Sequence, residues 1–141
     1  MSNFSDKDLD DVLAFFNLEG DYILFNVSHQ MFIDRYEEIT GTILHEFGHA
    51  IDKLLPDKGT DHGITKTQTF INAYNLEKDK TNFDDYFKST PAEFFAEVFA
   101  YLYSPDPRLR EKIKREAPET CKIILDAVEK GILPPDIRGL D

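Results

Sequence analysis

The stretch Glu37–Leu55 reads EEITGTILHEFGHAIDKLL, and its pattern predicts the helix around which the fold is organised. Apolar residues recur in it at helical spacing, and Pro56 marks the end of the run. These apolar positions are Ile39, Ile43, Phe47, Ala50, Ile51 and Leu54. Gly41 and Gly48 lie inside the expected helix, where each glycine costs about 1 kcal/mol relative to alanine. A cost of this size indicates that another part of the molecule approaches the helix closely.

The same helix carries His45-Glu46-Phe47-Gly48-His49, an H-E-x-x-H motif. Two histidines four residues apart lie on one helical face, so both imidazoles can reach one tetrahedral metal ion. Glu46 is then placed to accept a proton from a metal-bound water. The alternative is that both histidines are ordinary surface or core residues of an amphipathic helix. The position of the motif in the middle of a helix favours the metal site.

A catalytic zinc site usually has three protein ligands and a water, so two histidines need a third partner. The single cysteine, Cys121, lies in an apolar segment and does not suit this role. Glu93 and Glu97 are the only charged residues between Pro91 and Tyr103. Burying carboxylates among so many aromatic residues is costly unless a cation compensates them. We therefore expect Glu93 to be the third ligand and Glu97 to orient one histidine through its free ring N–H.

Glu93 has a second interpretation. The sequence Thr90-Pro91-Ala92-Glu93 fits a capping box, in which Thr90 caps the helix and the Glu93 side chain folds back onto it. A capping glutamate has no need of Glu97, whereas a ligand does. Spacing alone leaves both roles open for Glu93.

Taken together, these motifs resemble a known family. The segment His45-Glu46-Phe47-Gly48-His49-Ala50-Ile51-Asp52, then Tyr86, then Ala92-Glu93-Phe94-Phe95-Ala96-Glu97 is similar to the catalytic domain of the anthrax lethal factor family. Members of this family are single-zinc metallopeptidases of the gluzincin type. Proline-proline endopeptidases are a more distant branch that shares the tyrosine-to-glutamate spacing, with a shorter stretch after H-E-x-x-H. The resemblance covers about residues 41–130 of an expected single domain, 1–141.

The resemblance implies a zinc-dependent metalloendopeptidase, a peptide hydrolase that uses one Zn²⁺. The implied metal ligands are His45, His49 and Glu93, with Glu97 behind them in the outer shell. Glu46 would be the base that activates the zinc-bound water, and Tyr86 would donate a hydrogen bond to the developing oxyanion. The alternative function is a catalytically silent, zinc-stabilised binding domain or toxin component.

The charge and composition of the chain limit the classes of partner that we expect it to bind. The net charge is -11 and the sequence pI is about 4.7, so the surface repels phosphate backbones and we expect no nucleic-acid partner. A peptide or protein substrate with basic or apolar side chains is better matched, and we expect a monomer. No signal peptide or membrane-spanning segment is recognisable, and we expect no membrane partner. The missing signal favours the cytoplasm and the family favours secretion or delivery into a host, so the sequence does not assign a compartment.

The remaining pattern predicts an α+β fold dominated by helices, with a small N-terminal β element, and the resemblance implies a single small zincin-like domain. The expected strand is Tyr22–Val27, and a loop is expected over residues 78–89. The other expected helices are 5–17, 66–76, 91–103, 107–115 and 118–130. His29 and His62 are expected to be solvated loop residues. Asp52 either orients His49 or is a solvated helix carboxylate.

Overall fold

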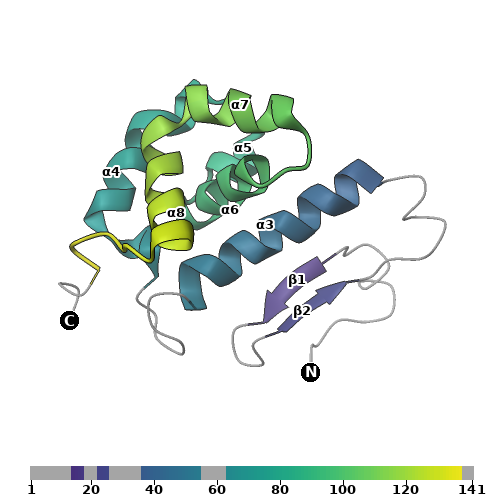
Figure 1. The fold of residues 1–141 in the computed structure, drawn as a ribbon, viewed down its shortest axis with the longest axis horizontal. Coiled ribbons are helices and arrows are strands. Elements are labelled where there is room, and N and C mark those ends of the chain that lie inside the picture. The colour runs from purple at the N-terminus through teal and green to yellow at the C-terminus, as the bar shows by residue number, and fades with distance from the viewer. Residues whose placement is uncertain (1–13, 18–21, 26–35, 55–62, 138–141) are drawn as a thin grey trace.

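The computed structural model describes residues 14–17, 22–25, 36–54 and 63–137 (Figure 1). Strands β1 (Ala14–Asn17) and β2 (Tyr22–Phe25) pair antiparallel, with Ala14 opposite Phe25. The helices are α3 (Tyr36–Leu54), α4 (Gln68–Glu77), α5 (Asp85–Lys88), α6 (Pro91–Leu102), α7 (Pro107–Glu116) and α8 (Pro118–Lys130), with 3₁₀ turns η1 (Ile64–Lys66) and η2 (Lys78–Lys80). None of the helices described is long and apolar enough to cross a membrane.

The expected α+β class is wrong, because the fold is helical. Over residues 36–53 and 63–137, where the structure places side chains, every regular element is a helix and none is a strand. The β1–β2 hairpin lies on the side of α3 opposite the other helices, and four residues per strand do not make a sheet layer (Figure 1). The expected N-terminal β element is therefore not part of the described core.

The helix expected over residues 5–17 is wrong at its end, because Ala14–Asn17 is β1; its earlier part lies outside the described residues. A short apolar run of this kind is compatible with a strand as well as a helix, so its periodicity is not decisive. The loop expected over 78–89 contains η2 and α5, each too short to show a helical repeat. The bounds of α3, α4, α6, α7 and α8 agree with prediction to within two residues.

Helix α6 is the centre of the helical core. It contacts each of the other α-helices that the structure describes, and α3 packs along its length. Phe94, Phe95 and Val98 of α6 are fully buried, because this helix is surrounded by α3 on one side and by α4, α7 and α8 on the other (Figure 1). Thr90 begins the helix by accepting a hydrogen bond from the backbone N–H of Glu93 at 3.1 Å.

The two glycines of α3 differ in what surrounds them. A Cβ added at Gly48 would lie 2.8 Å from Ala96 Cα and 3.1 Å from Phe99 Cβ, both on α6. At Gly41, no described atom lies within 4 Å of such a Cβ. Gly48 is therefore the position that lets α3 approach α6 closely, and Gly41 has no such role among the described residues.

This difference predicts that substitution of glycine by alanine changes the free energy of unfolding in opposite directions at Gly41 and at Gly48. Gly41→Ala should raise the free energy of unfolding by up to about 1 kcal/mol, because alanine is the better helix former. Gly48→Ala should lower it by about 1–3 kcal/mol, because the methyl group collides with the α6 backbone. Denaturant unfolding measures both. Equal stabilisation by the two variants would contradict the close approach at Gly48.

Three carboxylates other than Glu93 and Glu97 each bind the start of a helix that is distant in sequence. Each carboxylate accepts hydrogen bonds from both the backbone N–H and the hydroxyl of one threonine, at distances between 2.6 and 3.1 Å. The pairs are Asp52 with Thr65 of η1, Glu77 with Thr120 of α8, and Asp136 with Thr69 of α4. A negative charge at a helix start satisfies backbone N–H groups that lack a partner in the helix. These three carboxylate–threonine pairs fix η1, α4 and α8 to the rest of the core.

Candidate metal centre

His45, His49 and Glu93 converge where α3 crosses α6. Both histidines project from the same face of α3, and Glu93 lies in the first turn of α6. His45 Nε2 is 3.0 Å from Glu93 Oε2, and His49 Nε2 is 3.2 Å from Glu93 Oε1. One ligand atom from each of the three residues lies within 4.8 Å of the others. The structure thus brings together the three residues expected to hold a metal.

Glu93 was expected to be either part of a helix cap or a metal ligand, and its backbone and its side chain make different contacts. Its backbone N–H donates to Thr90 Oγ1, so Thr90 does cap the helix. Its carboxylate instead faces the two histidines of α3. The Thr90 half of the capping box is present, and the carboxylate is left for the cluster with His45 and His49.

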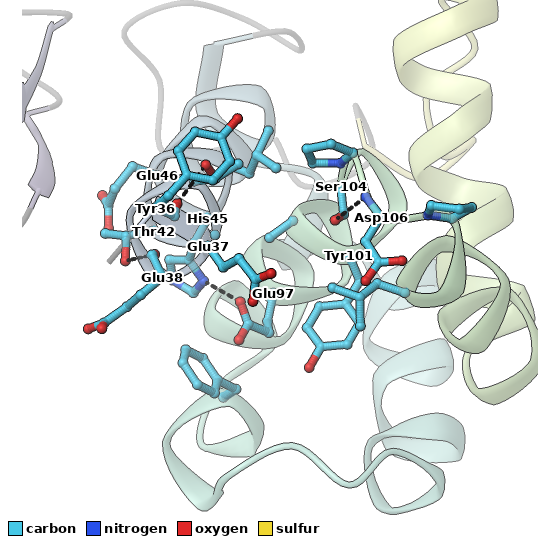
Figure 2. A pocket seen from close by; sticks show the side chains of 18 of the residues that line it. Tyr36, Glu37, Glu38, Thr42, His45, Glu46, Glu97, Tyr101, Ser104 and Asp106 are labelled. Carbon is cyan, nitrogen blue, oxygen red and sulfur yellow. Dashed lines mark hydrogen bonds and ion pairs between the residues drawn. The ribbon is translucent and has the colours of Figure 1, made fainter. Parts of the chain in front are cut away.

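Glu97 lies one turn after Glu93 and reaches the other nitrogen of His45. The distance from His45 Nδ1 to Glu97 Oε1 is 3.3 Å, and Figure 2 shows this contact as a dashed line. His45 is largely buried, with only 8% of its surface exposed. Each of its ring nitrogens faces a carboxylate, Nε2 that of Glu93 and Nδ1 that of Glu97. A carboxylate on the far nitrogen fixes the orientation and tautomer of an imidazole ligand.

The electrostatics of the cluster favour a cation. Burial lowers the pKa of His45, but hydrogen bonds to Glu93 and Glu97 outweigh it and raise the pKa to about 9. Burial raises the pKa of Glu93, but its hydrogen bonds to His45 and His49 bring it down to about 2. In the protein alone, a proton on the imidazole therefore supplies the positive charge between the carboxylates.

The donor set fits zinc. Two imidazole nitrogens and a carboxylate oxygen are ligands that zinc uses in sites with one open position. With metal–ligand bonds of about 2.0–2.2 Å, the ligand atoms of a tetrahedral site lie about 3.3–3.6 Å apart. Here the two histidine nitrogens approach different oxygens of Glu93, and single ligand atoms of the three residues lie within 4.8 Å of one another, so the side chains move closer together to hold an ion.

Glu46 and Tyr86 lie beside this cluster. Glu46 follows His45 on α3, and Tyr86 lies on α5 with 62% of its surface exposed. Partial burial, followed by the negative charge of Glu93 and Glu46, raises the pKa of Tyr86. The phenol therefore lies near both carboxylates and keeps its proton at neutral pH.

A cavity of about 750 Å³ opens next to Glu46. Residues from the first half of α3 line one side, and Tyr101, Ser104 and Asp106 line the other (Figure 2). Its acidic lining residues are Glu37, Glu38, Glu46, Glu97 and Asp106. No lysine or arginine is among the described residues that line it. The cavity therefore combines an aromatic and aliphatic wall with negative charge.

Two further residues differ from the sequence prediction. Asp52 is fully buried and binds Thr65, so it is not a solvated carboxylate, and its hydrogen bonds go to η1 instead of to His49. Phe87, which the sequence gave no reason to select, packs its ring against His45 with centroids 5.5 Å apart. His29 and His62 lie outside the described residues.

The fold and donor set define a helical H-E-x-x-H protein whose third candidate ligand is a glutamate on a second helix. The family model described as "Anthrax toxin lethal factor, N- and C-terminal domain" matches residues 4–127. The chain belongs to this family. It is similar to "Lethal factor" of Bacillus anthracis, with 36% identity over 89 residues. That alignment covers 61% of this chain and 11% of lethal factor, so the chain spans only a small part of the toxin's length.

The family model and the sequence motifs cover different parts of the chain. The match to the family model begins at residue 4, whereas sequence motifs supported a resemblance from about residue 41.

Proposed function

We propose that this protein is a zinc-dependent metalloendopeptidase. The observation that supports it best is the convergence of His45, His49 and Glu93 beside Glu46, at the edge of a cavity large enough for part of a peptide. Membership of the lethal factor family supports the same class. The proposal gives a role to the two histidines and the glutamate of the H-E-x-x-H motif, and to Glu93 and Glu97 of α6.

In the proposed site, His45, His49 and Glu93 hold one Zn²⁺, and Glu97 keeps the His45 ring in place. When bound, zinc supplies Lewis-acid chemistry, polarising a carbonyl oxygen and lowering the pKa of a water. The cation also compensates the Glu93 and Glu97 carboxylates, which lie in a partly buried position.

Glu46 and Tyr86 supply the proton transfer and the hydrogen bond that hydrolysis needs. A Glu46 carboxylate oxygen accepts a proton from the attacking water and later gives it to the leaving amine nitrogen. The Tyr86 phenol O–H donates to the carbonyl oxygen as that oxygen gains negative charge. The raised pKa of Tyr86 keeps this donor protonated at neutral pH.

The cavity indicates which peptides fit. Leu44, Phe87 and Tyr101 form apolar parts of its wall, while Glu37 and Glu38, both exposed residues of α3, add negative charge to its lining. A lysine or arginine places its aliphatic stem on such a wall and its charge beside carboxylates. We propose that the substrate is a polypeptide with basic and apolar residues near the scissile bond.

A peptide-library cleavage profile tests the function and the substrate together. We expect cleavage that a zinc chelator abolishes and added zinc restores, with lysine or arginine peptides cut about tenfold faster than matched glutamate peptides. Glu37→Gln should reduce this preference, because Glu37 is an exposed cavity residue. Glu129→Gln, an exposed change of the same charge at the end of α8, should not.

Two outcomes contradict these proposals separately. Zinc binding without cleavage of any peptide would overturn the peptidase and favour a silent zinc-stabilised domain. Chelator-sensitive cleavage with equal rates on acidic and basic peptides would keep the peptidase and overturn the substrate class.

A further inference from the structure

Phe87 contacts both His45 of α3 and Tyr86 of α5, two residues of the candidate site. Its ring meets the His45 imidazole edge-on, with centroids 5.5 Å apart and an interplanar angle of 63°. It meets the neighbouring Tyr86 ring with centroids 5.3 Å apart and an angle of 82°. A metal-ligand candidate and the proposed oxyanion donor therefore share one apolar contact.

Behind Phe87, aromatic packing continues into the core. The Phe83 ring lies 6.4 Å from Phe87 and 5.8 Å from Phe94, and Phe83 is buried. Phe94 is fully buried in α6, the central helix. The ring of Phe87 is thus supported by the core on one side and contacts His45 on the other.

The segment that carries Tyr86 depends on such contacts for its position. Helix α5 has only four residues, and a single helical turn is not stable by itself. Two polar contacts hold its end: the Tyr74 hydroxyl donates to the Lys88 carbonyl, and the Ser89 hydroxyl donates to the Tyr86 carbonyl at 2.6 Å. Phe87 is the residue of α5 that packs on the core and also touches α3.

We propose that Phe87 is a positioning residue, which holds the His45 ring and the Tyr86 phenol in the geometry that the reaction requires. This inference rests on the proposed peptidase function. It assigns Phe87 no contact with substrate chemistry, because a phenylalanine has no group that binds metal or transfers a proton. Its effect is to keep two reactive groups from moving relative to each other.

A double-mutant cycle tests whether Phe87 acts through Tyr86. Phe87→Leu should lower kcat about tenfold, because the orientation of the Tyr86 phenol is lost; leucine keeps an apolar side chain in the cavity wall, so KM should change less than kcat does. In the Tyr86→Phe background, assayed with saturating zinc so that the His45 contact does not limit occupancy, the same substitution should change kcat less than about twofold, since the donor it positions is already gone. Phe87→Tyr keeps a ring and should retain most of kcat.

Zinc titration of the same variants gives a readout that needs no turnover. Phe87→Leu should weaken zinc binding about tenfold, as loss of an outer contact to a histidine ligand typically does. Phe70→Leu is the control, because Phe70 is fully buried in α4, packs on Phe95, and has no described ring contact with His45 or Tyr86. It should lower stability at least as much and leave zinc affinity and kcat unchanged.

The outcomes separate this inference from the proposed function. If the unsubstituted protein binds zinc and cleaves peptides while Phe87→Leu is additive with Tyr86→Phe and binds zinc normally, Phe87 is only a packing residue. If the unsubstituted protein neither binds zinc nor cleaves, the peptidase proposal fails, and the positioning role fails with it.

Discussion

Glu46→Gln should lower kcat by about 10³-fold while the protein continues to bind zinc. Glutamine has nearly the same shape as glutamate but does not accept a proton at neutral pH, so only the base is removed. General-base catalysis contributes typically 10²–10⁴-fold, and the proposed site has no other described residue assigned to this step. Glu46 follows His45 on α3, and the His45 and His49 contacts to Glu93 do not involve it.

Paired measurements of kcat and metal content check this result. Glu111→Gln removes a carboxylate from the exposed face of α7 and should change neither quantity. Full activity in Glu46→Gln would show that another group is the base. Loss of zinc together with activity would show that Glu46 belongs to the metal-binding set.

Glu93→Ala should abolish zinc binding and, with it, peptide cleavage. The variant leaves two histidines, and two ligands make a weak site compared with three. It should not unravel the start of α6, because Thr90 caps that helix by accepting a hydrogen bond from the backbone N–H of residue 93, which alanine keeps. The variant should therefore be folded and metal-free, a combination that a simple stability defect would not give.

Glu97→Gln is the matched comparison. Glu97 contacts only the far nitrogen of His45 in the cluster, so its substitution should weaken zinc affinity by about 10–100-fold without abolishing it. Metal content by elemental analysis and thermal unfolding with and without zinc distinguish the two variants. Stoichiometric zinc in Glu93→Ala would overturn its assignment as a ligand and return it to a helix cap.

The sequence predicted the long helices well because their signals are redundant. Apolar residues repeat over several turns in α3, and prolines mark the first turns of α6, α7 and α8. The hairpin and α5 have too few residues for a repeat to distinguish strand, loop and helix. The fold class was wrong because aromatic and β-branched residues near the start suggested a small β element as part of the fold, whereas the regular elements of the described core are helices.

In the candidate site, local sequence patterns predicted that His45, His49 and Glu93 lie together, but not which other segments pack around them. His45 and His49 follow from the helical repeat, and the pairing with Glu93 follows from the cost of burying a charge. Whether Gly41 or Gly48 faces another backbone depends on which side of α3 meets α6, and no local pattern states that. The hydrogen bonds of Asp52 to Thr65 and the contact of Phe87 with His45 were not predicted for the same reason, because these partners are set by packing between distant segments.

The three carboxylate–threonine pairs bear on whether the fold depends on bound zinc. None of Asp52, Glu77 and Asp136 belongs to the donor set, and the hydrogen bonds described for them fasten η1, α8 and α4. The architecture is thus anchored independently of the place where zinc would enter. We therefore expect these three attachments to remain when a chelator withdraws zinc, so that unfolding followed with and without the chelator retains the contribution of η1, α4 and α8.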